Sequence, residues 1–99
     1  MSVKTVIARQ LRERVNATRE KLGELNTPSE GWLRTVRKAL GMSGAQLARR
    51  MGMTRGAVAR NEKAELEGGI TLKTMKQMAV NMNCRFVYCL LYTSPSPRD

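Results

Sequence analysis

The chain has 99 residues, and its 18 Lys and Arg residues against 8 Asp and Glu residues give a formal charge of +10 at pH 7. This length allows one small core with an additional arm and excludes two independent domains. The excess of positive charge favours a polyanionic partner, and nucleic acid is the commonest one for a basic domain. Histidine, the most frequent general base and metal ligand, is absent. We therefore expect no enzymatic activity, no metal site and no cofactor.

The sequence lacks the hydrophobic segments that direct a chain to a membrane. No apolar run approaches the roughly 20 residues of a membrane span. Basic residues interrupt residues 1–15 every few positions, unlike the apolar block of a signal peptide. The aromatic residues are too few for a membrane-surface helix. We expect a cytoplasmic protein without membrane contact.

The two cysteines, Cys84 and Cys89, do not indicate a reactive or metal-binding site. Their spacing along the chain matches no zinc-binding pattern. We interpret them as buried or idle thiols. The sequence also contains no Gly-rich phosphate loop and no nucleophile beside a base.

Residues 1–25 have the composition and periodicity of an amphipathic helix. Apolar or half-apolar side chains recur every three or four residues, at Ile7, Leu11, Val15, Thr18, Leu22 and Leu25. Basic side chains surround this stripe. Three interpretations are open: the helix folds back on its own domain, pairs with a second copy of the chain, or lies along phosphates.

Residues 26–31 form a loop that separates this helix from the rest of the chain. Pro28 cannot continue a helix, and the neighbouring Asn, Ser and Gly residues are typical of loops. A helical period of apolar residues resumes at Trp32, so we expect the next helix over residues 31–40. It begins a domain that spans residues 32–83.

The middle of that domain has the pattern of two short helices joined by a glycine turn. Ser43 and Thr54 are hydroxyl residues suited to cap the two helices. Leu47 and Ala48 provide a core face for the first helix, and Gly52 follows it where a left-handed backbone is usual. Helices joined in this way cross at a steep angle, so the second projects from the domain. The sequence predicts an all-α helix-turn-helix fold whose recognition helix, at about residues 54–63, enters the major groove of double-stranded DNA.

The C-terminal third is predicted to contain a linker, a helix, a strand and a foreign tail. Residues 63–69 end in two glycines and form the linker. Thr71 caps a helix with a Met-rich apolar face, and residues 84–88 are predicted as a short strand. The last segment, CLLYTSPSPRD at residues 89–99, resembles translated sequencing adaptor. We interpret it as non-native and exclude it from functional reasoning.

The position of each polar residue in the predicted motif indicates its role on DNA. Residues in the first turns of the recognition helix face base edges, so the candidate base-reading residues are Arg55, Gly56, Ala57 and Arg60. Flanking polar residues are the candidate phosphate contacts: Ser43, Gln46, Arg49, Arg50, Thr54 and Lys63. Val58 faces the core, and Glu62 is expected in an internal ion pair.

These residues resemble the phage-repressor and Cro type of helix-turn-helix domain over about residues 32–82. The resemblance lies in Ser43, the Leu47-Ala48 pair, Gly52 and Thr54, with Glu62 near the end of the second helix. In that family a Gln that clamps phosphate commonly follows the first cap, whereas this chain has Gly44.

Longer segments are similar to the mobile mystery protein A family over nearly all of residues 1–88. The matching segments are GWLRTVRKALGMS, AVARNEKAE, ITLKTMKQMA and CRFVY. The resemblance implies a transcriptional regulator that autorepresses a small mobile operon, whose second gene encodes the Fic-domain protein mobile mystery protein B. It leaves one alternative open: an antitoxin-like protein that binds and inhibits a Fic-domain partner.

A homodimer is expected, because a single helix-turn-helix module buries too little surface for tight operator binding. The chain offers two surfaces for pairing, the predicted strand and the N-terminal stripe. We favour the stripe, since the foreign tail replaces whatever follows the strand. The candidate dimerisation residues are Ile7, Leu11, Val15, Leu22 and Leu25.

Overall fold

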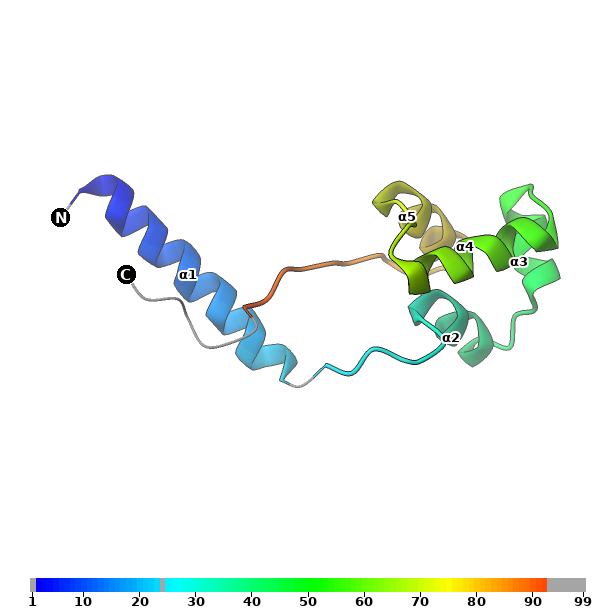
Figure 1. Cartoon of the computed structure of the whole chain (residues 1–99), viewed down its shortest axis with the longest axis horizontal. Helices are drawn as coiled ribbons and strands as arrows, with labels where there is room; N and C mark the ends of the chain where they lie inside the picture. The colour runs from blue at the N-terminus through cyan, green and yellow to red at the C-terminus, as the bar shows by residue number, and fades with distance from the viewer. Residues whose placement is uncertain (1, 24, 93–99) are drawn as a thin grey trace. The chain divides into compact units, whose positions relative to one another are not determined.

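The computed structural model describes residues 2–23 and 25–92. This part of the chain contains five α-helices: α1 (Val3–Leu22), α2 (Trp32–Ala39), α3 (Gly44–Met51), α4 (Arg55–Glu67) and α5 (Leu72–Asn81) (Figure 1). Residues 27–87 form one compact unit that holds α2 to α5, and α1 belongs to a second unit. The prediction of an all-α fold is confirmed for the described residues. None of their helices is both long and apolar enough to cross a membrane.

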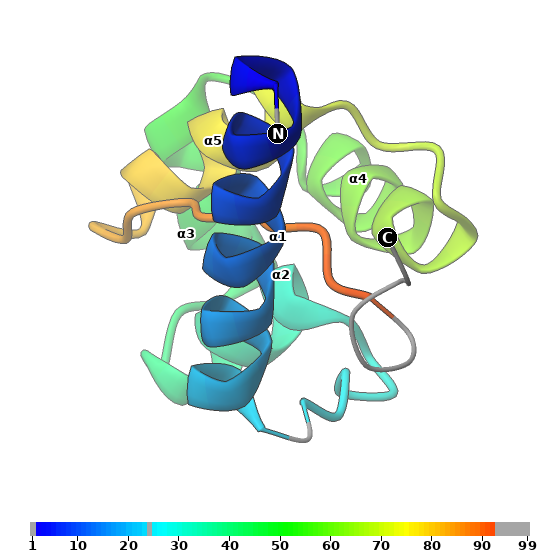
Figure 2. The same cartoon turned by 90° about the vertical axis from the view of Figure 1, so that its left-hand side faces the viewer.

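Helix α1 is one uninterrupted helix without a buried residue (Figure 2). Ser2 caps its start, where the side-chain oxygen accepts a hydrogen bond from the Thr5 N–H at 3.1 Å. The helix ends at Leu22 rather than at about Leu25, because Gly23 has a positive φ of 59° that leaves the helical path. Residues 1 and 24 of the predicted N-terminal segment lie outside the described residues.

The core of the 27–87 unit is built from all four of its helices. Its buried side chains are Leu33, Leu47, Ala48, Val58, Met78 and Met82. Leu47 and Met78 are both fully inaccessible to solvent, which places them at the centre of the core. Burying a side chain of this size contributes about 1.5–3 kcal/mol each. The core therefore holds α3 and α4 in a fixed arrangement against α2 and α5.

The predicted helix caps are confirmed. The side-chain oxygens of Ser43, Thr54 and Thr71 each accept a backbone N–H three residues further on, at 3.1 Å. Ser43 also forms a capping box, because its own N–H donates to Gln46 Oε1 at 2.7 Å. Gly52 ends α3 in the left-handed conformation, with φ of 66° and ψ of 33°. Each cap of this type typically stabilises its helix by about 1 kcal/mol.

The predicted linker at residues 63–69 is wrong over most of its length. Helix α4 continues to Glu67, and only Gly68 and Gly69 leave it. Gly68 is the left-handed C-cap, with φ of 76°. The helix extends this far because Glu62 and Glu65 hydrogen-bond to α2, so its last turns are held by tertiary contacts that local sequence does not reveal.

The predicted strand at residues 84–88 is also wrong. These residues have no regular secondary structure, and the described part of the chain contains no strand with which they could pair. A β-strand needs a partner to satisfy its backbone groups, so aromatic and branched residues alone do not produce one. Cys84 instead packs against the core, and Cys89 is exposed. The foreign tail predicted at residues 89–99 lies outside the described residues from 93 onward.

Candidate nucleic-acid interface

Helix α4 presents one side to the core and the opposite side to solvent. Val58 and Glu62, four residues apart, are its buried residues. The exposed side carries Arg55, Gly56, Ala59, Arg60 and Lys63. Because side chains four residues apart lie on the same helix face, these residues form a continuous strip along α4. We call them the exposed strip.

Three of the four predicted base-reading residues lie on this strip. Arg55, Gly56 and Arg60 are exposed, whereas Ala57 is half-buried. Ala59, which sequence reasoning missed, is exposed on the strip, and DNA contact of Ala57 stays a prediction. Its spacing of four residues from Arg55 was the signal that could have identified it.

Gly56 lies between Arg55 and Arg60 on the exposed strip and has no side chain to cover the backbone of α4 there. A Cβ atom at this position would lie 3.5 Å from Arg60 Nη1 and 3.9 Å from Thr54 Oγ1, which is ordinary contact distance. The fold therefore has room for a side chain at residue 56. Gly56 is the second residue of α4, in its first turn, where glycine is still a weaker helix former than alanine. The packing of the domain therefore does not require glycine at residue 56.

A mostly buried ion pair holds α4 to α2. Arg37 Nε and Nη2 donate to the two carboxylate oxygens of Glu62, at 2.7 and 3.1 Å, and Nη1 donates to the Met42 carbonyl at 3.0 Å. The side chains of Arg37 and Glu62 are only 13% and 9% exposed. The hydrogen bond to Glu62 raises the pKa of Arg37, so this guanidinium stays charged. The expected internal ion pair of Glu62 is thus confirmed.

A second carboxylate of α4 caps the start of α2. Glu65 accepts hydrogen bonds from the backbone N–H groups of Trp32 at 2.7 Å and of Leu33 at 2.9 Å. Gly31, the residue before α2, has no side chain with which to cap the helix and a positive φ of 84°. This φ favours glycine, and a Cβ atom at Gly31 would lie 2.9 Å from Glu65 Oε1, so a side chain here would displace the Glu65 carboxylate. The carboxylate takes the place of the missing cap.

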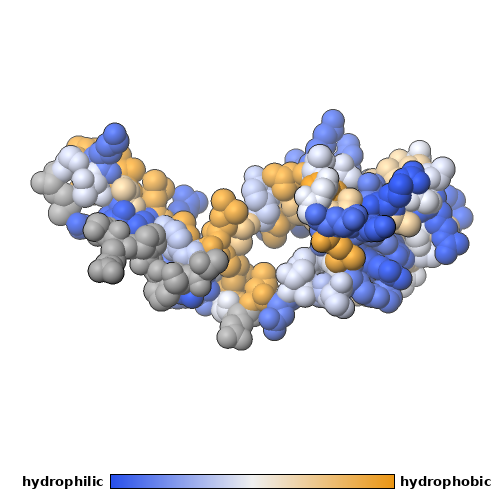
Figure 3. Space-filling model, viewed as in Figure 1, coloured by the Kyte–Doolittle hydropathy of each residue, from blue (hydrophilic) through white to orange (hydrophobic). Residues whose placement is uncertain are grey.

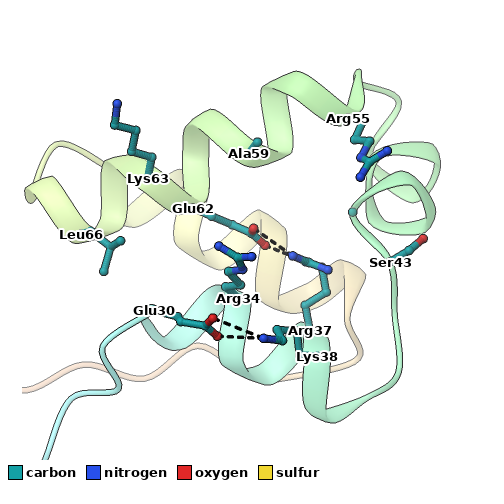
Figure 4. Close-up of a pocket in the computed structure, with 11 residues that line it drawn as sticks. Glu30, Arg34, Arg37, Lys38, Ser43, Arg55, Ala59, Glu62, Lys63 and Leu66 are labelled. Carbon is teal, nitrogen blue, oxygen red and sulfur yellow. Dashed lines mark hydrogen bonds and ion pairs between the residues drawn. The ribbon is translucent and has the colours of Figure 1, made fainter.

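A groove of about 610 Å³ runs between α2 and α4 (Figure 4). The first turn of α3 borders one end of it, where a Cβ atom built on Gly44 would lie 3.7 Å from Arg55 Cγ. We call it the α2–α4 groove, and its lining residues are Glu30, Arg34, Arg37, Lys38, Ser43, Gly44, Arg55, Ala59, Glu62, Lys63 and Leu66. It therefore adjoins the exposed strip of α4.

Positive charge predominates in the α2–α4 groove. Its two carboxylates, Glu30 and Glu62, are each bound by a cation, since Lys38 Nζ lies 3.1 Å from Glu30 and Arg37 holds Glu62. The hydrogen bond and the charge of Lys38 lower the pKa of Glu30, so this surface pair is ionised at neutral pH. The side chains of Arg34, Arg55 and Lys63 are the remaining cations of the lining.

The predicted phosphate contacts are distributed around α3 and α4. Ser43, Gln46 and Thr54 use their side-chain oxygens as helix caps, and the Gln46 amide nitrogen stays available for a ligand. Arg50 Nη1 donates to the Asn81 carbonyl at 3.1 Å, which ties it to the end of α5. Arg49 is exposed on α3, and Lys63 lines the α2–α4 groove. Contact of these residues with phosphate stays a prediction.

Comparison with known proteins identifies the type of domain. A family model for the helix-turn-helix matches residues 33–89, which is more than half of the chain. No curated protein and no solved structure matches the chain. The matched region contains α3, the Gly52 turn and α4.

Proposed function

The chain belongs to the helix-turn-helix family, and on that basis we propose that it is a transcriptional regulator that represses its own operon. Helix α4 is the recognition helix in this proposal. The observation that carries it is the exposed strip of α4, where two arginines flank a glycine that the fold does not require. Such a surface fits the major groove, whose base edges accept hydrogen bonds from arginine.

Arg55 and Arg60 have separate roles in this proposal. An arginine fork matches the O6 and N7 acceptors of guanine, which makes Arg55, in the first turn of α4, the principal base-reading residue. Arg60 lies further along the strip and reads an adjacent base or holds a phosphate. Gly56 and Ala59 allow the helix to approach the bases closely, and the methyl group of Ala59 is suited to contact a thymine methyl.

We further propose that the regulator acts as a homodimer paired through α1. Ile7, Leu11 and Leu22 are 49%, 56% and 39% exposed, and Val15 is half-buried on the same stripe. Orange, apolar side chains lie on the surface of α1 in Figure 3. A second copy of the stripe would cover them. Dimers of this type bind two half-sites related by two-fold symmetry.

The resemblance to mobile mystery protein A supports two finer proposals. In the first, the regulator controls an operon that also encodes a Fic-domain protein. In the second, the chain is antitoxin-like and itself binds and inhibits that enzyme. The exposed apolar stripe of α1 can serve the second proposal only in place of the pairing proposed above, because one surface does not hold both partners at once. A titration of the purified chain with the Fic-domain enzyme separates the two.

Selection of bound sequences from a random duplex library tests the proposed function directly. We expect enrichment of a palindromic site, and the same site upstream of the chain's own gene. Fluorescence anisotropy then compares the selected duplex with a scrambled one of equal length, at a stated salt concentration. Equal affinity for the two duplexes would contradict sequence-specific recognition.

A further inference from the structure

The α2–α4 groove contains one cation, Arg34, that belongs neither to the core nor to the exposed strip and forms no ion pair within the described residues. Within the described residues, its carboxylates form ion pairs with Arg37 and Lys38. Arg34 is exposed on α2, and Figure 4 shows its side chain extending toward α4. Arg55 lines the same groove from α4, whereas Figure 4 shows the side chain of Lys63, also a lining residue, extending away from α2. An exposed groove with this surplus of cations attracts an anion.

The first turn of α3 adds backbone donors at one end of this groove. The backbone N–H groups of Gln46 and Leu47 donate hydrogen bonds to Ser43. The first two N–H groups of α3, those of Gly44 and Ala45, have no acceptor within the helix. Such donors and the positive end of the helix dipole favour phosphate. Ala59 and Leu66 add apolar side chains to the lining of the groove.

We propose that the α2–α4 groove holds the DNA backbone that borders α4, with Arg34 of α2 as a phosphate-binding residue. The proposal rests on the proposed function, because it places α4 in the major groove. A helix in that groove, which is about 12 Å wide, has a sugar–phosphate strand on either side. Helix α2 borders α4 on one side, so a side chain of α2 that extends over the α2–α4 groove meets that strand. The planar guanidinium of Arg34 can donate two hydrogen bonds to one phosphate.

Glu30 limits the affinity of this site. It lines the α2–α4 groove and holds Lys38 Nζ with both carboxylate oxygens, at 3.1 and 3.3 Å. It thus places negative charge beside the proposed phosphate position. It also pairs with the ammonium group of Lys38, which would otherwise be available to a phosphate. Removing this charge therefore strengthens DNA binding.

The test compares three variants of the full chain on a short duplex of mixed sequence, because phosphate contacts do not depend on base sequence. Arg34→Gln removes the proposed contact. Lys76→Gln, an exposed cation on α5 outside the α2–α4 groove, is the control with the same loss of charge. Glu30→Gln removes the opposing carboxylate. Affinity is measured by fluorescence anisotropy between about 50 and 200 mM NaCl, and circular dichroism verifies that each variant is folded.

We expect Arg34→Gln to reduce the slope of log affinity against log salt by about 0.9, with binding on the order of tenfold weaker at low salt. Lys76→Gln should leave the slope unchanged, and Glu30→Gln should increase the affinity. Equal behaviour of Arg34→Gln and Lys76→Gln would overturn the phosphate site while leaving DNA binding intact. Failure of the unmodified chain to bind the duplex at low salt would instead overturn the proposed function and the phosphate site together.

Discussion

Arg37 of α2 grips both carboxylate oxygens of Glu62 in α4, at 2.7 and 3.1 Å, and thereby joins the first helix of the domain to the recognition helix. Three residues further along α4, Glu65 caps the start of α2. Both contacts come from the side of α4 that faces α2, next to the exposed strip. The orientation of the strip within the domain therefore depends on two carboxylates that lie outside the strip.

Glu62→Ala should destabilise the fold strongly. Removal of the carboxylate leaves the mostly buried guanidinium of Arg37 without its partner, which typically costs about 3–5 kcal/mol in the free energy of unfolding. Urea denaturation followed by circular dichroism measures this change.

The double variant Arg37→Met with Glu62→Leu is the control for that measurement. It removes both charges together, so it should recover much of the lost stability. Recovery should be incomplete, because Arg37 also donates to the Met42 carbonyl. A loss of less than about 1 kcal/mol in Glu62→Ala would show that the pair contributes little.

Glu65→Ala should cost about 1–2 kcal/mol in the free energy of unfolding, because it leaves the first N–H groups of α2 without an acceptor. Glu67→Ala is the matched control, since Glu67 is an exposed carboxylate at the end of the same helix. Its effect should stay within about 0.5 kcal/mol. Thermal melts of the two variants under the same conditions compare them, and equal melting temperatures would contradict the capping role.

The fold was predicted correctly from the sequence where the stabilising interactions are local. Ser43, Thr54 and Gly52 act within one helical turn, so residue type alone indicated each cap and the turn between α3 and α4. The partners of Glu62 and Glu65 lie 25 and more than 30 residues away, and no local pattern identifies them. For the same reason the sequence placed the end of α4 too early.

In the candidate site too, residues placed by local sequence were predicted, and a residue placed by tertiary packing was not. Arg55, Gly56 and Arg60 were found by counting from a confirmed cap, and the structure exposes all three. Arg34 was missed because it belongs to a different helix and reaches the α2–α4 groove only through tertiary packing. The strand prediction failed because β-structure depends on a pairing partner, which the composition of residues 84–88 cannot supply.

Gly56→Ala separates stability from DNA binding. Alanine is preferred over glycine by about 1 kcal/mol in a helix interior and by less in the first turn, where Gly56 lies, and the space around residue 56 accommodates a Cβ atom. The variant should therefore melt at a higher temperature. Its affinity for the selected operator should nevertheless fall, because the added methyl group lies on the surface that approaches the bases. Unchanged operator affinity would remove Gly56 from the interface.

Arg55→Ala should weaken binding to the selected operator by about 1–3 kcal/mol and relax the preference at one base pair. Its effect on a scrambled duplex should be smaller, since a base contact matters only where the correct base is present. Anisotropy titrations on both duplexes at one salt concentration compare these losses. Equal losses on the two duplexes would identify Arg55 as a phosphate contact instead.

Deletion of residues 1–25 should convert the proposed dimer into a monomer that retains the helix-turn-helix fold. Residues 27–87 form a compact unit with its own core, so the shortened chain keeps its helical spectrum and its melting transition. It should lose most of its affinity for an operator with two half-sites, because each half-site then binds a separate molecule. Analytical ultracentrifugation of the intact and shortened chains measures the change in mass.

Leu11→Asp provides a finer test of the same interface. Leu11 is 56% exposed at the middle of the α1 stripe, so the substitution leaves the core of the 27–87 unit untouched. In a helix pair it would bury a carboxylate without a partner, which opposes association. Gln10→Asp, one position away on the exposed surface of α1, adds the same charge outside the stripe and should leave the dimer intact. Dimers that persist in both variants would place the interface elsewhere, and a monomeric intact chain at tens of micromolar would exclude pairing through α1 altogether.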